Sequence, residues 1–208
     1  YQTKSKIKDS VQILYQHSPE RTVRNGSKVV YNKFRASFIT LTLPSKQKHS
    51  DIEIKQCLNR FLVNLRKVYS LENYVWKAEL QQNKNIHFHI IIDKYIHHNS
   101  IRYYWNKAIS HLGYIEDYKR KWKGLTLTEY CLKRQISKTK GRKGYNFGVN
   151  TDWSNPPVEN VSLIQSVRML ANYLSKYIAK DVDDESDIER IKSFGRVWAR
   201  SQSLSRYK

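Results

Sequence analysis

Residues 85–93 read NIHFHIIID, a run with the composition of a β-strand. Because successive side chains of a strand point to opposite faces, His87 and His89 share one face of it. The other face is apolar and is expected to enter the core; it carries Ile86, Phe88, Ile90 and Ile92. The two imidazoles start about 7 Å apart along the strand, a spacing that lets both converge on one metal ion.

A second strand is predicted over Asn73–Leu80, joined to the first by a polar turn at residues 81–85. If this hairpin is symmetric about Asn83, Glu79 lies directly opposite His87, on the same face of the sheet. A His-His-Glu set with open coordination positions suits a catalytic divalent ion such as Mn²⁺, Mg²⁺ or Zn²⁺. A His-x-His strand also occurs without any metal role, and the nearby carboxylate is what favours the metal interpretation.

The flanking sequence predicts an α+β fold. Residues 36–43 form an aromatic and β-branched strand, and apolar residues at helical spacing predict a helix over Asp51–Tyr69. Further helices are predicted at residues 99–112 and 166–180, and a last strand at residues 195–203. The order strand, helix, strand, strand, helix, helix favours a largely antiparallel sheet over a doubly wound parallel one.

The helix predicted at residues 166–180 contains two tyrosines, Tyr173 and Tyr177, at the edge of its apolar stripe. That stripe is formed by Val167, Leu170, Ala171, Leu174 and Ile178. Lys176 and Lys180 lie beside the tyrosines on the polar side. A phenol flanked by ammonium groups can act as a nucleophile toward a metal-held phosphate. The same i, i+4 spacing is also typical of two tyrosines that pack on a half-buried helix.

The chain has 208 residues, with 38 Lys and Arg against 18 Asp and Glu, and a net charge of +20. This excess indicates a polyanionic partner or an anionic membrane surface. No apolar run approaches the length of a membrane-spanning helix, and no signal-peptide core is found. Cys57 and Cys131 form no CxxC pair, which argues against a disulfide scaffold or a zinc ribbon and favours a reducing compartment.

Residues 119–143 hold ten of the basic residues against one acid, Glu129. The predicted DNA contacts in this segment are Lys119, Arg120, Lys121, Lys123, Lys133, Arg134, Lys138, Lys140, Arg142 and Lys143. Trp122, Tyr130 and Tyr145 are predicted to stack on unpaired bases. The alternative is a solvated insertion whose charge adds only to the general field.

The chain is expected to comprise a basic N-terminal arm or hairpin at residues 1–35 and one domain at residues 36–204. The basic insertion would occupy about residues 119–150 of that domain. Asn25-Gly26 is a typical two-residue turn and would join the two strands of an N-terminal hairpin.

Taken together, these motifs resemble those of the HUH endonucleases, in particular the rolling-circle replication initiators (Rep proteins) of small phages and plasmids. Phe38–Thr42 resembles their first strand motif, His87-Phe88-His89 their His-hydrophobe-His motif, and Tyr173–Lys180 the two-tyrosine version of their tyrosine motif. Glu79 lies where these initiators often place a third ligand, and Gly195–Trp198 is similar to a segment that follows their tyrosine helix.

The resemblance implies an HUH endonuclease domain, in which a central antiparallel sheet of the ferredoxin or RRM type is flanked by helices. It implies that His87, His89 and Glu79 hold the divalent ion, which would polarise a scissile phosphate in single-stranded origin DNA. The implied setting is the cytoplasm of a host cell, with neither a membrane nor a small molecule as partner.

The resemblance also implies that Tyr173 or Tyr177 attacks that phosphate, without deciding between them. The products would be a 3′-OH that primes replication and a 5′-phosphotyrosine, from which the strands are later rejoined. Lys176 and Lys180 would hold phosphate or stabilise developing charge. Because the sequence has no GxxxxGK[ST] loop, unwinding is expected to come from a separate helicase.

Three other classes of protein fit parts of this sequence. Relaxases and single-strand transposases use the same chemistry, although the long histidine cluster of many relaxases is absent from the sequence. A non-enzymatic single-stranded nucleic-acid-binding protein would use the same basic charge while its histidines and tyrosines merely pack. A membrane-surface protein is disfavoured because the basic segment does not read as an amphipathic helix.

Overall fold

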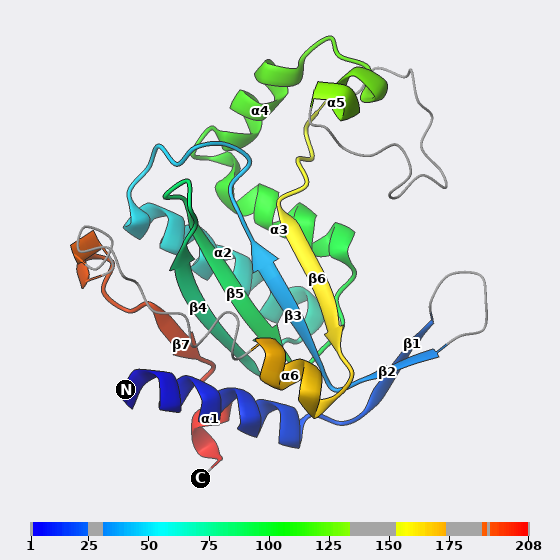
Figure 1. The fold of residues 1–208 in the computed structure, drawn as a ribbon, viewed down its shortest axis with the longest axis vertical. Coiled ribbons are helices and arrows are strands. Elements are labelled where there is room, and N and C mark those ends of the chain that lie inside the picture. The colour runs from blue at the N-terminus through cyan, green and yellow to red at the C-terminus, as the bar shows by residue number, and fades with distance from the viewer. Residues whose placement is uncertain (1, 25–30, 134–152, 174–188, 191, 208) are drawn as a thin grey trace.

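The computed structural model has a five-stranded antiparallel sheet at its centre (Figure 1). The strands lie side by side in the order β6 (Glu159–Ile164), β3 (Ala36–Leu41), β5 (Ile86–Ile92), β4 (Tyr74–Leu80) and β7 (Trp198–Arg200). The structure describes residues 2–24, 31–133, 153–173, 189–190 and 192–207. Every pair of neighbouring strands in this sheet is antiparallel, which confirms the predicted α+β class.

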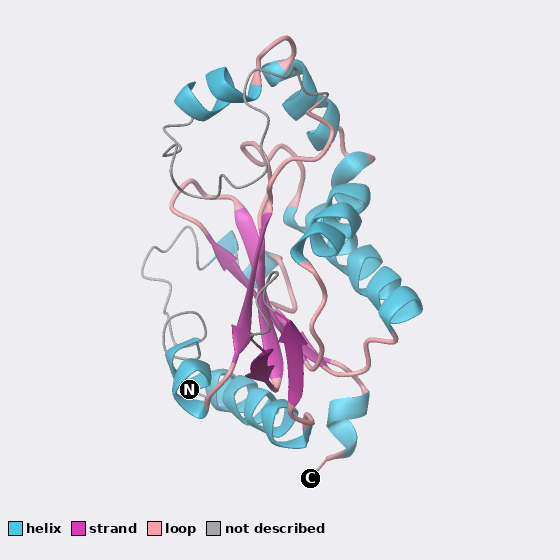
Figure 2. Cartoon of the chain, turned by 90° about the vertical axis from the view of Figure 1, so that its right-hand side faces the viewer, coloured by secondary structure: helices cyan, strands magenta, loops and turns pink. Residues whose placement is uncertain are grey.

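Two long helices, α2 (Asp51–Tyr69) and α3 (His98–Ser110), cover one face of the sheet (Figures 1 and 2). α2 has the bounds predicted from the sequence, because Ser50 and Glu53 form a capping box that starts it. The main core lies between these helices and the sheet and includes Ile39, Leu41, Ile54, Leu58, Phe61, Phe88, Ile90 and Trp105. Burying each such side chain contributes about 1.5–3 kcal/mol, so this face carries much of the stability of the fold.

The opposite face of the sheet is covered at one end by α1 (Gln2–His17) and α6 (Val167–Tyr173) (Figure 2). A second, smaller core lies there and includes Ile7, Val11, Leu14, Phe38, Val75, Ile91, Ile164, Leu170 and Leu204. Leu204 comes from a short 3₁₀ helix, η2 (Ser203–Arg206). α1 was not predicted, because its apolar residues, although they recur at helical spacing, are set among polar and basic ones.

The N-terminal hairpin forms a two-stranded ribbon of its own, with β1 (Arg21–Arg24) antiparallel to β2 (Tyr31–Phe34). Pairing of two strands on either side of Asn25-Gly26 was predicted, although the second strand begins at Tyr31, later than expected. The turn itself lies outside the described residues. The side chain of Arg21 donates to the backbone carbonyl of Asp93, which ties the ribbon to the end of β5.

The basic segment begins in helices that the sequence did not predict, α4 (Tyr114–Trp122) and α5 (Leu127–Lys133). Tyr118, Trp122, Tyr130 and Trp153 pack together there as an aromatic cluster, separate from the two sheet cores. β6 was not predicted either, because its sequence ENVSLI lacks a clear alternation of apolar and polar residues. No helix in the described part of the chain has the length and apolar character needed to cross a membrane.

Candidate metal centre and tyrosine helix

The hairpin formed by β4 and β5 has the register predicted from the sequence. Glu79 is paired with His87, and Lys77 is paired with His89 two positions along. Since directly paired residues of an antiparallel sheet share a face, Glu79 and both histidines project on the same side. This is the face opposite to α2 and α3, and it is only partly covered by α1 and α6 (Figure 2).

The turn that sets this register is held by local and distant hydrogen bonds. The Gln81 amide donates to the Asn85 carbonyl, and the Lys84 amide donates to the Gln81 carbonyl, both at 2.8 Å. The Asn85 side chain accepts from the Gln47 amide and donates to the Ser45 carbonyl, both at 2.8 Å. These bonds tie the tip of the hairpin to the segment before α2, and they fix where Glu79 and His87 meet.

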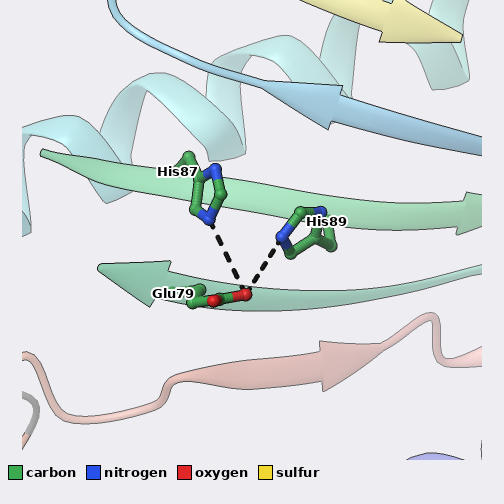
Figure 3. A group of neighbouring side chains, drawn as sticks. All are labelled: Glu79, His87 and His89. Carbon is green, nitrogen blue, oxygen red and sulfur yellow. Dashed lines mark hydrogen bonds and ion pairs between the residues drawn. The ribbon is translucent and has the colours of Figure 1, made fainter. Parts of the chain in front are cut away.

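Glu79, His87 and His89 converge on one point (Figure 3). The Nε2 atom of His89 lies 3.1 Å from Oε2 of Glu79, and the Nε2 atom of His87 lies 3.7 Å from the same oxygen. One ligand atom from each residue lies within 4.8 Å of the other two. The group is the only such cluster of three or more potential ligands among the described residues.

The surroundings of these side chains fit a divalent cation. Both ring nitrogens of His87 are buried without a hydrogen-bond partner among the described residues, an arrangement that is costly unless another group satisfies them. The Nδ1 atom of His89 lies 3.2 Å from Oγ1 of Thr40. If Nδ1 donates to this hydroxyl, Nε2 is left unprotonated on the side of Glu79, as metal binding requires.

The charge states of the site point the same way. Burial lowers the pKa of His89 below its ordinary value, and this outweighs the opposite effect of the nearby Glu79 carboxylate. His89 is therefore neutral at neutral pH, which is the form that binds metals. One carboxylate and two imidazoles make a mixed oxygen and nitrogen set that can accept Mn²⁺, Mg²⁺ or Zn²⁺.

The tyrosine helix lies next to this cluster. Ser166 caps α6 by accepting a hydrogen bond from the Met169 amide, and Leu170 enters the second core. At the end of α6, the ring of Tyr173 stacks on Phe38 with centroids 4.3 Å apart. Phe38 in turn stacks on His89 at 5.4 Å. Tyr173 is thereby linked to the metal-ligand group through one intervening ring.

Other predictions for this helix meet the structure unevenly. Val167 was predicted to belong to the buried stripe but is 69% exposed, because the first turn of α6 lies outside the second core. The residues of the predicted helix that lie outside the described part of the chain include Leu174, Lys176, Tyr177, Ile178 and Lys180. The roles predicted for these residues remain predictions.

The predicted DNA-binding segment is described in its first part only. The side chains exposed to solvent there are those of Lys119, Arg120, Lys121, Lys123 and Lys133. Those outside the described residues are Arg134, Lys138, Lys140, Arg142, Lys143 and Tyr145. DNA binding by these basic residues remains a prediction.

The aromatic residues of that segment do not lie as a base-stacking surface would require. Trp122 and Tyr130 are buried, and their ring centroids lie 4.9 Å apart. Tyr130 also packs against Trp153, and its hydroxyl accepts a hydrogen bond from that of Tyr118 at 2.7 Å. Because these rings fill the small core between α4 and α5, their faces are used by protein contacts in this structure.

Comparison with known proteins decides the family. A family model that describes replication-associated proteins of the ORF2 type matches residues 36–182, well over half of the chain. The chain belongs to this family. Comparison with curated proteins and with solved structures gave no match. Membership confirms the resemblance to HUH-type rolling-circle initiators, and the matched range contains the metal-ligand group and both tyrosines.

Two residues of this Rep protein that touch the site were not singled out from the sequence. Phe38 and Thr40 lie on β3, two positions apart and on the face of His89. They occur within the first strand motif of the family, but nothing local indicates what they touch. Their role follows from the pairing of Thr40 with His89, between strands separated by α2 and β4.

Proposed function

We propose that this Rep protein nicks single-stranded DNA at a replication origin and becomes covalently attached to it through a tyrosine. The observation that carries the proposal is the convergence of Glu79, His87 and His89 beside a helix that brings Tyr173 to the same face of the sheet. Membership of a replication-associated family supports DNA as the partner.

The three ligands would hold a divalent cation, whose positive charge makes a bound phosphate more susceptible to attack. Glu79 contributes the negative charge of the set, and its carboxylate lies on the common point of the two imidazoles. Thr40 orients the ring of His89 from the other side. The nearly buried setting keeps these side chains in one arrangement before DNA binds, which is favourable for catalysis.

The reaction is a transfer of a phosphoryl group to a phenol. The oxygen of Tyr173 or Tyr177 attacks the phosphorus, and the bond from phosphorus to the 3′ oxygen breaks, with its electron pair leaving on that oxygen. The phenolic proton ends on the departing oxygen, so the products are a 3′-OH and a 5′-phosphotyrosine. Attack by a 3′-OH on the phosphotyrosine reverses these steps and rejoins strands. Lys176 and Lys180 are proposed to hold phosphate during both directions.

The net charge of +20 supports binding of the DNA strand on both sides of the nick. Exposed basic residues of α4, namely Lys119, Arg120 and Lys121, are the described part of the proposed DNA-contacting segment. Charge reversal at Lys119 and Lys121 is expected to weaken binding and to flatten its dependence on salt concentration. A salt dependence equal to that of the unmodified chain would remove this segment from the DNA interface.

The proposal is tested by incubating the chain with Mn²⁺ and a randomised pool of single-stranded oligonucleotides labelled at the 3′ end. The attached fragment keeps that label, because the tyrosine is joined to its 5′ phosphate. We expect a covalent complex on a denaturing gel that a chelator abolishes. Tyr103→Phe, which changes an exposed tyrosine of α3, serves as the matched control. Complex that forms normally in both Tyr173→Phe and Tyr177→Phe, or no complex with any substrate, contradicts the proposal.

A further inference from the structure

Phe38 lies between the metal-ligand group and the tyrosine helix. Its ring stacks on Tyr173 with centroids 4.3 Å apart and planes inclined by 16°. Its ring also stacks on His89 with centroids 5.4 Å apart and planes inclined by 20°. The three rings come from α6, β3 and β5, so a single aromatic column connects the proposed nucleophile to a proposed metal ligand.

Phe38 is a rigid part of this column. Its side chain is 4% exposed and packs in the second core, which also contains Ile91 and Val75. β3 is hydrogen-bonded on both sides, to β5 and to β6, so the backbone of Phe38 is held in the middle of the sheet. A ring fixed in this way can serve as a reference surface for the side chains that stack on it.

Tyr173 is held differently from Phe38. It is the last residue of the described part of α6, is only partly buried, and rests against the second core from outside. The stack on Phe38 restrains the plane of its phenol relative to the sheet. Offset stacking of aromatic rings restricts both the distance and the inclination of the partner.

We propose that Phe38 is a positioning residue for the tyrosine nucleophile. Its ring fixes the phenol of Tyr173 relative to His89, and therefore relative to the group formed with Glu79 and His87. The inference rests on the proposed nicking function and adds that Tyr173 is a nucleophile whose placement depends on this ring. Because a displacement of about 1 Å can cost about 100-fold in rate, loss of the ring would slow the attack more than it affects DNA binding.

The test uses the full chain carrying Tyr177→Phe, so that any adduct reports on Tyr173. Formation of the covalent complex on the 3′-labelled oligonucleotide pool with Mn²⁺ is followed over time at several DNA concentrations. We expect Phe38→Leu to lower kcat by about 10- to 100-fold with little change in KM. Phe38→Tyr keeps an aromatic ring and is expected to restore most of the rate.

Two controls separate positioning from a general loss of structure. Phe61→Leu makes the same change at a fully buried position in the core on the opposite face of the sheet. We expect it to lower the free energy of unfolding without changing kcat. Mn²⁺ affinity, measured by titration calorimetry, is expected to be the same in Phe38→Leu as in its parent.

Each other outcome overturns a distinct statement. An unchanged kcat in Phe38→Leu, an equal loss in Phe61→Leu, or a loss of rate matched by a loss of Mn²⁺ affinity overturns the positioning role. If Tyr177→Phe forms no adduct while the unmodified chain does, Tyr173 is not a nucleophile and the inference fails while the nicking function stands. If the unmodified chain forms no adduct, both fail.

Discussion

The two faces of the central sheet are built from the same strands and differ in how completely they are covered. On β5, Phe88 projects into the core beneath α2 and α3, whereas the flanking His87 and His89 project onto the other face. The first face is apolar and closed by two long helices. The second is closed only at one end, by α1 and α6, and keeps a polar group beside that smaller core (Figures 1 and 2). Stability and chemistry are thus separated by the alternation of one strand.

The strongest test of this separation removes the carboxylate from the partly covered face. Glu79→Gln keeps the size of the side chain but removes the negative ligand, so we expect Mn²⁺-dependent formation of the covalent complex to fall by about 1000-fold or more. Urea unfolding is expected to change little. Glu72→Gln, which changes an exposed acid just before β4, is the matched control. Activity that persists in Glu79→Gln would show that the cluster is not the metal site.

The complementary change is made on the closed face, at the residue between the two histidines. Phe88→Ala is expected to lower the free energy of unfolding by about 3–5 kcal/mol, because it leaves a cavity in the main core. Urea denaturation measures this loss. Mn²⁺ affinity of the folded protein, measured under conditions where the variant remains folded, is expected to be retained. A parallel collapse of metal affinity would show that the two faces are coupled through β5.

A smaller effect is expected from the hydroxyl beside His89. Thr40→Val preserves the shape of the side chain but removes the 3.2 Å contact with Nδ1 of His89. Partners of this kind typically contribute about 10- to 100-fold to metal affinity, and calorimetric titration with Mn²⁺ measures the loss. In the control Thr42→Val, the hydroxyl that is lost bonds the Val158 carbonyl, and metal affinity should be unaffected. Equal affinities in the two variants would argue against a role for Thr40.

The smallest effect concerns a buried acid at the far end of the same face. Asp93 is 6% exposed, and burial raises the pKa of its carboxyl above the ordinary value even though Asn73 donates a hydrogen bond to it. A raised pKa means that stability is lost as pH rises from the unfolded-state value of 3.8 through the folded-state value. Asp93→Asn should therefore unfold at higher urea than the parent at neutral pH, with no advantage below pH 3.8. An advantage that is independent of pH would point to a cause other than ionisation.

Parts of the fold with strong local signals were predictable from the sequence. α2 has the expected bounds because a capping box and a stripe of apolar residues act over a few neighbouring positions. The pairing of Glu79 with His87 was predictable because a short turn joins the two strands, so turn length alone sets the register. The elements that were missed have weaker local signals: α1 sets its apolar residues among polar and basic ones, and β6 lacks alternation.

The sequence by itself determined the metal-ligand group, because all three ligands belong to one hairpin whose register depends on adjacent residues. Only the tertiary structure decided that Thr40 and Phe38 touch His89, and that Tyr173 stacks on Phe38. These contacts join segments separated by whole helices and strands. Their pairing depends on the order of strands in the sheet and on the packing of α6 against one face, both of which are settled by the burial of the two cores rather than by any local pattern.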